Sequence, residues 1–319
     1  MVPVSLTCPQ CGATLPSQAR WRTVECLYCS AVVSPRVRTI LAADFRAAYE
    51  RSLSDDDGGS RIVCAGRRYR ILDTLAASGQ VLLAQSIGAG PERVVLKLSQ
   101  APDAARTLQH EAAILRQLQA AAIPGAAYFS QRLPQLVARG AATGNVAHGT
   151  EALVVRHPVG YWGSLADVQR HYPHGIDPRH AVWMWRRMLD VLGYVHAAGW
   201  THGRLAPEHL LVHPGDHGIL IIGWSRAQRI GAAAMATAAR DLMQTAWSIR
   251  SLLHGGSDDG APPVAASVPA PLATLLRRAS EDADWCARQG AAGIDQALQA
   301  AASAAFGPPR FIHFTPTPR

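Results

Sequence analysis

The sequence is short of lysine, of charge in general and of aromatic side chains. Lys97 is the single lysine among 31 basic residues, and charged residues make up only 17% and aromatic residues only 6% of the 319 positions. No apolar run reaches the roughly 18 residues that a membrane span requires, and the N-terminal residues lack the basic start and apolar core of a signal peptide. We therefore expect a soluble, cytoplasmic protein that makes no membrane contact.

Arginine and small apolar side chains are present in excess. Hydrophobic residues make up 48% of the chain, and the formal net charge is +8. This hydrophobic content supplies a sizeable core and excludes a disordered chain. The arginines are scattered rather than clustered, so the positive charge gives only weak support for a nucleic-acid partner.

Two Cys-x2-Cys pairs lie close to the N-terminus, in CPQCG and CLYCS. A two-residue gap lets a tight turn direct both thiolates at one ion, and two such turns complete a tetrahedral sulfur site with no open position for catalysis. Disulfides are the alternative, which a cytoplasmic chain disfavours. Residues 1–38 therefore resemble a zinc ribbon, and the resemblance implies a structural Zn²⁺ bound by Cys8, Cys11, Cys26 and Cys29.

The role of this ribbon stays open between a structural or docking module and a nucleic-acid contact. The module is mildly basic, since its only acidic residue is Glu25 and its arginines are Arg20, Arg22, Arg36 and Arg38. The two remaining cysteines, Cys64 and Cys286, fall outside any paired pattern, and we expect them to be core-packing thiols.

A linker follows the ribbon. Residues 39–51 have helical apolar spacing, and SLSDDDGGS is typical of a flexible linker. Alternating apolar residues then predict strands over 69–75, 80–87 and 93–99, a helix over about 104–119, and strands over 133–139 and 151–157. Beyond Gly163 the pattern is mostly helical, with one hairpin between Leu210 and Ile222.

The motifs of this second part occur in the order found in protein kinases. Lys97, in RVVLKLS, resembles the strand lysine that contacts nucleotide phosphates. Glu111, in HEAAIL, resembles the helix glutamate that pairs with this lysine. EALVVRHPVGYWGSL resembles the strand and hinge that hold adenine, and THGRLAPEHLLV resembles the catalytic loop. HGILIIGWSRA resembles the strand before the metal-binding triplet. Asp241 resembles the aspartate that holds the catalytic loop in place.

This resemblance to bacterial Ser/Thr kinase-like proteins implies a fold and a domain organisation. The expected fold is α+β and bilobal, with a small β-rich lobe and a large helical lobe, preceded by the zinc ribbon. The expected boundaries are 1–38 for the ribbon, 39–65 for the helix and linker, 66–310 for the kinase-like domain and 311–319 for a C-terminal tail.

The departures from the kinase pattern fall on the catalytic positions. Arg204 replaces the catalytic aspartate, and a guanidinium cannot act as a base because it stays protonated. His209 replaces the metal-binding asparagine and Gly223 the metal-binding aspartate, so the oxygen ligands that Mg²⁺ requires are missing. The glycine-rich loop is shortened to one glycine, Gly79, before Val81.

We therefore expect a protein without kinase activity that scaffolds or allosterically regulates a protein partner. The resemblance implies that ATP or another nucleotide could be bound without Mg²⁺, through Gly79, Val81, Lys97 and Glu111. Two alternatives remain: an atypical ATP-dependent transferase that uses Lys97, and a nucleic-acid-associated protein that works through its ribbon.

Two further segments have ambiguous patterns. Trp183, Met184, Trp185 and Met188 could form a ligand site, although their helical spacing favours a core position. The C-terminal segment PPRFIHFTPTPR alternates apolar residues, which predicts docking either onto its own domain or onto a partner.

Overall fold

The computed structural model of the chain consists of two compact units, Met1–Gly58 and Gly59–Arg319. It describes residues 8, 13–16, 24–27, 29–30, 32–33, 60–76, 80–88, 92–145, 150–215, 217–231, 235–254 and 267–316. The predicted helix over 39–51 and the acidic run of the linker lie outside these residues. The boundary between the units falls inside the predicted linker.

The first unit contains a small two-stranded sheet. β1 (Val24–Glu25) pairs antiparallel with β2 (Val32–Val33), with Val24 opposite Val33. Cys8, Leu15 and Cys26 are buried beside this sheet and form its small core. The sheet therefore holds the second cysteine pair next to Cys8.

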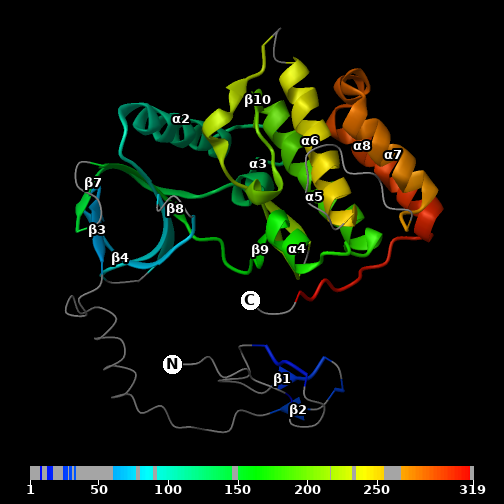
Figure 1. Cartoon of the computed structure of the whole chain (residues 1–319), viewed down its shortest axis with the longest axis horizontal. Coiled ribbons are helices and arrows are strands. Elements are labelled where there is room, and N and C mark those ends of the chain that lie inside the picture. Colours follow the sequence, from blue (N-terminus) through cyan, green and yellow to red (C-terminus); the bar gives the residue numbers. More distant parts are fainter. Residues whose placement is uncertain are drawn as a thin grey trace. The chain divides into compact units, whose positions relative to one another are not determined.

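The second unit begins with a closed antiparallel barrel (Figure 1). The strand order around the barrel is β3-β4-β5-β6-β8-β7, and β3 pairs with both β4 and β7. The strands are β3 (Arg61–Cys64), β4 (Arg67–Thr74), β5 (Val81–Ser86), β6 (Arg93–Ser99), β7 (Leu136–Gly144) and β8 (Thr150–Arg156).

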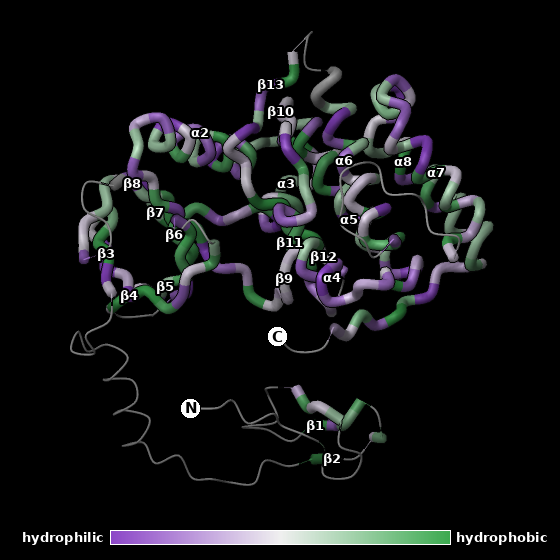
Figure 2. The backbone as a smooth tube through the Cα atoms, in the orientation of Figure 1, coloured by the Kyte–Doolittle hydropathy of each residue, from purple (hydrophilic) through white to green (hydrophobic). Residues whose placement is uncertain are grey.

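Side chains along these strands point alternately into the barrel and away from it, which separates an apolar interior from an outer face. Ile62, Tyr69, Leu82, Val94 and Leu96 are buried in the barrel core, and the corresponding hydrophobic stretches of the strands are green in Figure 2. Neighbouring residues of β6 point outward because successive side chains of a strand face opposite sides. Lys97 therefore lies on the outer face, toward the helix α2 (Pro102–Gln119).

The prediction of a bilobal kinase-like fold is wrong, because the β-rich part is a closed six-stranded barrel. The α+β class is confirmed, and β4, β5, β6 and β8 lie where the sequence predicted strands. β7 overlaps the strand predicted over 133–139 only in part, because it begins at Leu136 and continues to Gly144. β3 was not predicted, because its four residues lie in the segment interpreted as linker. This strand bridges β4 and β7 and thereby closes the sheet.

The rest of the second unit is mainly helical and packs on the outer face of the barrel through α2. Leu115 and Leu118 of α2, Leu153 of β8 and Trp185 belong to one continuous core. The helices of this part are α3 (Ala126–Phe129), α4 (Leu165–His171), α5 (Pro178–Ala197), α6 (Met235–His254), α7 (Ala270–Glu281) and α8 (Ala283–Phe306). Within the described residues, no helix is long and apolar enough to cross a membrane.

Short strands and turns connect these helices and carry the loop motifs. The predicted hairpin is present as β11 (Leu210–His213) and β12 (Gly218–Ile221), with β9 (Gly163–Ser164) paired to β11. β10 (Trp200–Thr201) pairs with β13 (Gln228–Arg229). Two single-turn 3₁₀ helices, η3 (Pro207–His209) and η4 (Trp224–Arg226), lie between these strands.

The C-terminal segment docks onto its own unit. Phe314 is only 4% exposed, and its ring contacts those of Tyr172 and His180. Phe311 is half-exposed and its ring lies 5.3 Å from that of His217. Residues 317–319 of the predicted tail lie outside the described residues.

Closure of the barrel depends on glycine at position 144, which is opposite Ile62 in the β3–β7 pair. Its φ is +152°, and a Cβ atom there would lie 2.1 Å from the carbonyl oxygen of Arg61. We expect Gly144→Ala to lower the free energy of unfolding by at least about 2 kcal/mol, because backbone must move to admit the methyl group. Chemical denaturation measures this loss.

The matched control is Gly140→Ala in the same strand, where a Cβ would meet no atom within 4 Å. That change should alter stability by no more than about 0.5 kcal/mol. Equal effects of the two changes would contradict the role of Gly144 in closure.

Candidate functional site

A buried carboxylate joins the barrel, α2 and η4. Glu111, on α2, is 2% exposed and accepts a hydrogen bond of 2.5 Å from the Nζ of Lys97 on β6. The same oxygen, Oε1, accepts the backbone N–H of Trp224 at 3.3 Å. The structure thus brings together the two residues that the sequence paired, and adds a third contact that no pattern indicated.

Lys97 remains accessible from one side. Its side chain is 21% exposed, whereas that of Glu111 is 3% exposed. An ammonium group carries three N–H donors, and within the described part of the chain only Glu111 is bonded to Nζ. Lys97 can therefore offer its other donors to an anion in solvent. Val81 lies directly opposite Lys97 in the β5–β6 pair, while Gly79 lies outside the described residues.

The loop after β10 is fixed by α6. Asp241 is fully buried, and its two carboxylate oxygens accept the backbone N–H groups of His202 at 2.7 Å and Gly203 at 2.8 Å. The Gln244 side chain accepts the N–H of Leu205 at 2.8 Å. Three backbone donors of the loop are therefore held by one face of α6, as the sequence predicted for Asp241.

His202 is a buried neutral ring at the centre of this loop. It is fully buried and its Nε2 donates to the carbonyl oxygen of Ile222 at 3.0 Å. Its ring contacts the Trp224 indole edge-on at 4.7 Å. Burial lowers the pKa of His202 to about 4, although the charge of Asp241 opposes this shift.

The three positions at which the sequence departs from the kinase motifs lie in this loop or close to it. The Arg204 side chain is exposed, and no described carboxylate pairs with it. The Nδ1 of His209 donates to the carbonyl oxygen of Arg204 at 3.0 Å, which fixes the ring beside Gly223. A Cβ at Gly223 would lie 2.7 Å from Cδ2 of His209, and the φ of Gly223 is +83°. No carboxylate side chain fits at position 223 while His209 keeps this position.

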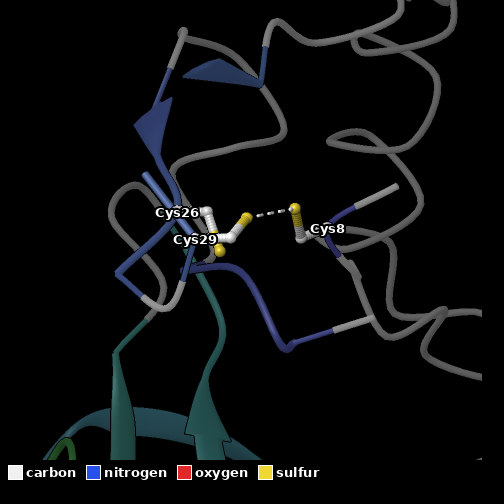
Figure 3. Close-up of side chains that lie close together, drawn as sticks. All are labelled: Cys8, Cys26 and Cys29. Carbon is white, nitrogen blue, oxygen red and sulfur yellow. Dashed lines mark hydrogen bonds between the residues drawn. The ribbon is translucent and has the colours of Figure 1, made fainter. Parts of the chain in front are cut away.

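A second candidate site lies in the N-terminal unit, where three cysteine side chains converge (Figure 3). The Sγ atoms of Cys8, Cys26 and Cys29 all lie within 4.8 Å of one another, an arrangement that could hold a metal ion. Cys11, the fourth predicted ligand, lies outside the described residues, as do Arg20, Arg22, Arg36 and Arg38.

The sulfur geometry separates metal binding from a disulfide. The Sγ atoms of Cys8 and Cys29 are 3.7 Å apart, whereas a disulfide requires about 2.05 Å. Two thiolates on a tetrahedral zinc ion, each at about 2.3 Å, lie about 3.8 Å apart. The observed spacing therefore fits two ligands of one such ion.

The turn after the second cysteine pair is strained by a side chain. The N–H of Ser30 donates to the carbonyl oxygen of Cys26 at 2.9 Å, and Ser30 has a φ of +55°. This left-handed conformation favours glycine, and here serine adopts it at the position directly after Cys29.

The two remaining cysteines are buried, and neither belongs to a cluster of metal-ligating side chains in the described chain. The Sγ of Cys286 donates to the carbonyl oxygen of Ala279 at 3.2 Å, and burial together with Asp282 raises its pKa to about 11. Burial also raises the pKa of the Cys64 thiol in the barrel core. Both are therefore protonated, weakly reactive thiols, as the sequence predicted.

Comparison with known proteins finds no match, either among protein-family models or among curated protein sequences. The interpretation of both sites therefore depends on their own geometry and on the sequence motifs.

Two residues that position the site were not foreseen. Trp224 contributes its backbone N–H to Glu111, and His209 fills the space beside Gly223. No sequence signal marks either contact, because both arise from the path of the chain between β12 and η4. The sequence marks His209 only as the residue that replaces the metal-binding asparagine of the kinase pattern.

The buried ring of His202 predicts acid sensitivity. The pKa is about 4 in the folded state and about 6.5 in the unfolded chain, so only the unfolded chain takes up a proton between these values. The contribution of the neutral His202 ring to the free energy of unfolding is therefore fully present above pH 6.5. It declines by about 3 kcal/mol as the pH falls to 4.

Denaturation at a series of pH values tests this expectation. His202→Gln should show a flatter decline in the free energy of unfolding between pH 6.5 and 4, and the exposed His174→Gln should retain the slope of the unchanged protein. The same slope in both variants would contradict the assignment.

Proposed function

We propose that the second unit is a non-catalytic binding module, which holds a nucleotide through Lys97 without transferring its phosphate and which regulates or scaffolds a protein partner. The observation that carries this proposal is the packing of His209 against Gly223, where a Cβ would lie only 2.7 Å from the ring. Phosphoryl transfer depends on metal-assisted charge stabilisation. A loop that excludes a carboxylate at this position cannot supply the metal ligand.

The resemblance of the loop motifs to those of protein kinases supports the same conclusion. The position of the catalytic base is occupied by Arg204, whose exposed guanidinium stays protonated. Lys97 and Glu111 keep the ion pair that such proteins use beside a nucleotide. The residues that would bind the nucleotide are thus present, whereas the position of the catalytic base holds a residue that cannot act as one.

Exposed apolar side chains on the barrel support the proposal that this unit binds a protein partner. Val63, Leu72 and Leu75 are between 37% and 50% exposed, and they lie on β3, on β4 and directly after β4. Because large apolar side chains exposed on a surface can mark interaction sites, we expect a protein partner to contact this part of the barrel.

Thermal denaturation with ATP tests nucleotide binding. We expect ATP to raise the melting temperature equally with and without Mg²⁺, and radiolabelled phosphate transfer to the protein or to generic substrates to be absent. Because Lys97→Ala alone would leave Glu111 buried and unpaired, at a cost of about 3–5 kcal/mol, the binding variant is Lys97→Ala/Glu111→Gln. This variant should fold and should lose the ATP-induced shift.

Transfer that depends on Lys97 would contradict the non-catalytic proposal and favour an atypical transferase. An unchanged ATP response in the double variant would contradict the role of Lys97. For the partner, the full chain serves as bait in its native cells. A stoichiometric protein captured by the unchanged chain should be lost with Leu72→Glu and retained with Val159→Glu, an exposed position outside the barrel.

For the first unit, we infer a structural zinc ion bound by Cys8, Cys11, Cys26 and Cys29. The buried positions of Cys8 and Cys26 and the 3.7 Å separation of two of the sulfurs support this inference. When bound, the ion would supply folding free energy and no open coordination position.

Metal analysis and thiol titration test the zinc site. We expect one zinc per chain and almost no reactive thiol in the native protein, and four reactive thiols after chelation, since Cys64 and Cys286 stay buried. Cys8→Ser should lower the zinc content of the dialysed protein well below one per chain, because a tetrahedral site loses one of its four ligands, whereas Cys64→Ser should not change it. Equal zinc contents of the two variants would contradict the ligand assignment.

A further inference from the structure

A pocket of about 710 Å³ is formed by α5, α8 and the C-terminal segment. α5 and α8 pack side by side, and the C-terminal segment, red in Figure 1, leaves from the end of α8. The pocket is lined by Arg179, Val182, Trp183, Arg186, Gln299, Ala302, Ser303, Phe306, Gly307, Pro308, Pro309, Arg310 and Ile312.

The lining residues of each helix form a single face. Those of α5 and those of α8 both recur at spacings of three and four, which places them on one side of a helix. Gly307 ends α8 with a φ of +75° and turns the chain so that the two following prolines close the third side. The volume lies within the range of small-molecule sites.

Trp183 explains why the aromatic segment of α5 was ambiguous in the sequence. Met184, Trp185 and Met188 are fully buried in the core, as their spacing predicted. Trp183 instead faces the pocket, and its ring stacks on that of His217 at 6.5 Å with an interplanar angle of 12°. Phe306 lines the α8 side, and the Cζ of Arg179 lies 5.2 Å from the centre of its ring. The pocket thus has an aromatic side chain on each of its two helices.

All the charged side chains that line the pocket are positive. Three arginines and no carboxylate line it. Asp295, which lies outside the lining, accepts a hydrogen bond of 2.9 Å from the Nε of Arg186. In the described chain the two terminal nitrogens of Arg186 have no other bonded partner, and its Cζ lies 5.6 Å from the centre of the Trp183 ring. The guanidinium is thus oriented by Asp295 and can still bind an anion with its terminal nitrogens.

We propose that this pocket binds a small planar aromatic anion, with its ring against the apolar lining that includes Trp183 and Phe306 and its carboxylate or phosphate on Arg186. A cation would be repelled by the three guanidinium groups. A neutral apolar ligand would desolvate the arginines without a compensating hydrogen bond. This site is independent of the nucleotide site proposed at Lys97.

Isothermal titration calorimetry of the full chain tests the proposal with three probes: 1-naphthoate, 1-naphthyl phosphate and the neutral 1-naphthamide. We expect the protein to bind at least one of the two anions, and at least tenfold more tightly than the amide. The tighter of the two anions identifies the preferred charged group. Binding of neither anion at millimolar concentration, or equal binding of the amide, would overturn the proposal.

Two neighbouring arginines of α5 provide a matched pair of variants. Arg186 pairs with Asp295 and its side chain is 28% exposed, while Arg187 pairs with Asp190 and is 34% exposed. Arg186→Gln can still hydrogen-bond Asp295 and should weaken anion binding at least tenfold, whereas Arg187→Gln should leave it unchanged. Equal affinities of the two variants would overturn the assignment of Arg186.

A third variant tests the pocket itself rather than its charge. Ser303 is exposed on the α8 wall, and Ser303→Trp should fill the pocket and abolish binding while all three arginines remain. Circular dichroism and the melting temperature establish that each variant is folded. Undiminished binding by folded Ser303→Trp would place the anion elsewhere and overturn the proposal.

Discussion

The second unit depends on one buried carboxylate. Glu111 lies on α2, yet its Oε1 contacts a side chain of the barrel and a backbone N–H of η4. A carboxylate removed from water requires a counter-charge and hydrogen bonds, and these come from two segments far apart in the chain. Because each contact satisfies the same oxygen, the barrel, the helix and the turn are fixed relative to one another. The apolar core that continues from α2 and β8 into the helices stabilises the same arrangement.

Asp241 has the corresponding role on the helical side. It accepts two adjacent backbone N–H groups of the loop, and its Oδ2 lies 3.1 Å from the Nε2 of His196. The backbone of this loop is therefore held by hydrogen bonds to a fully buried side chain.

The sequence predicted the individual strands and helices better than it predicted the closure of the sheet into a barrel. The strands from β4 to β8 and the helix α2 follow apolar periodicity, which is local and strong. β3 has only four residues and follows a polar linker, so its pairing with β7 depends on contacts more than seventy residues apart. In the site, the Lys97–Glu111 pair was predicted by the resemblance of the two segments to kinase motifs. The contact of His209 with the Gly223 position was not, because it arises from a backbone path that no residue pattern encodes.

The single lysine has a consequence for how the protein can be modified. Acetylation, ubiquitin conjugation and amine-directed cross-linking all need an accessible, deprotonated ε-amine. The only ε-amine of this chain is on Lys97, where it is mostly buried and bonded to Glu111. Loss of its charge by acylation would leave that carboxylate without its partner. Every lysine-directed signal on this protein is therefore coupled directly to the integrity of its fold.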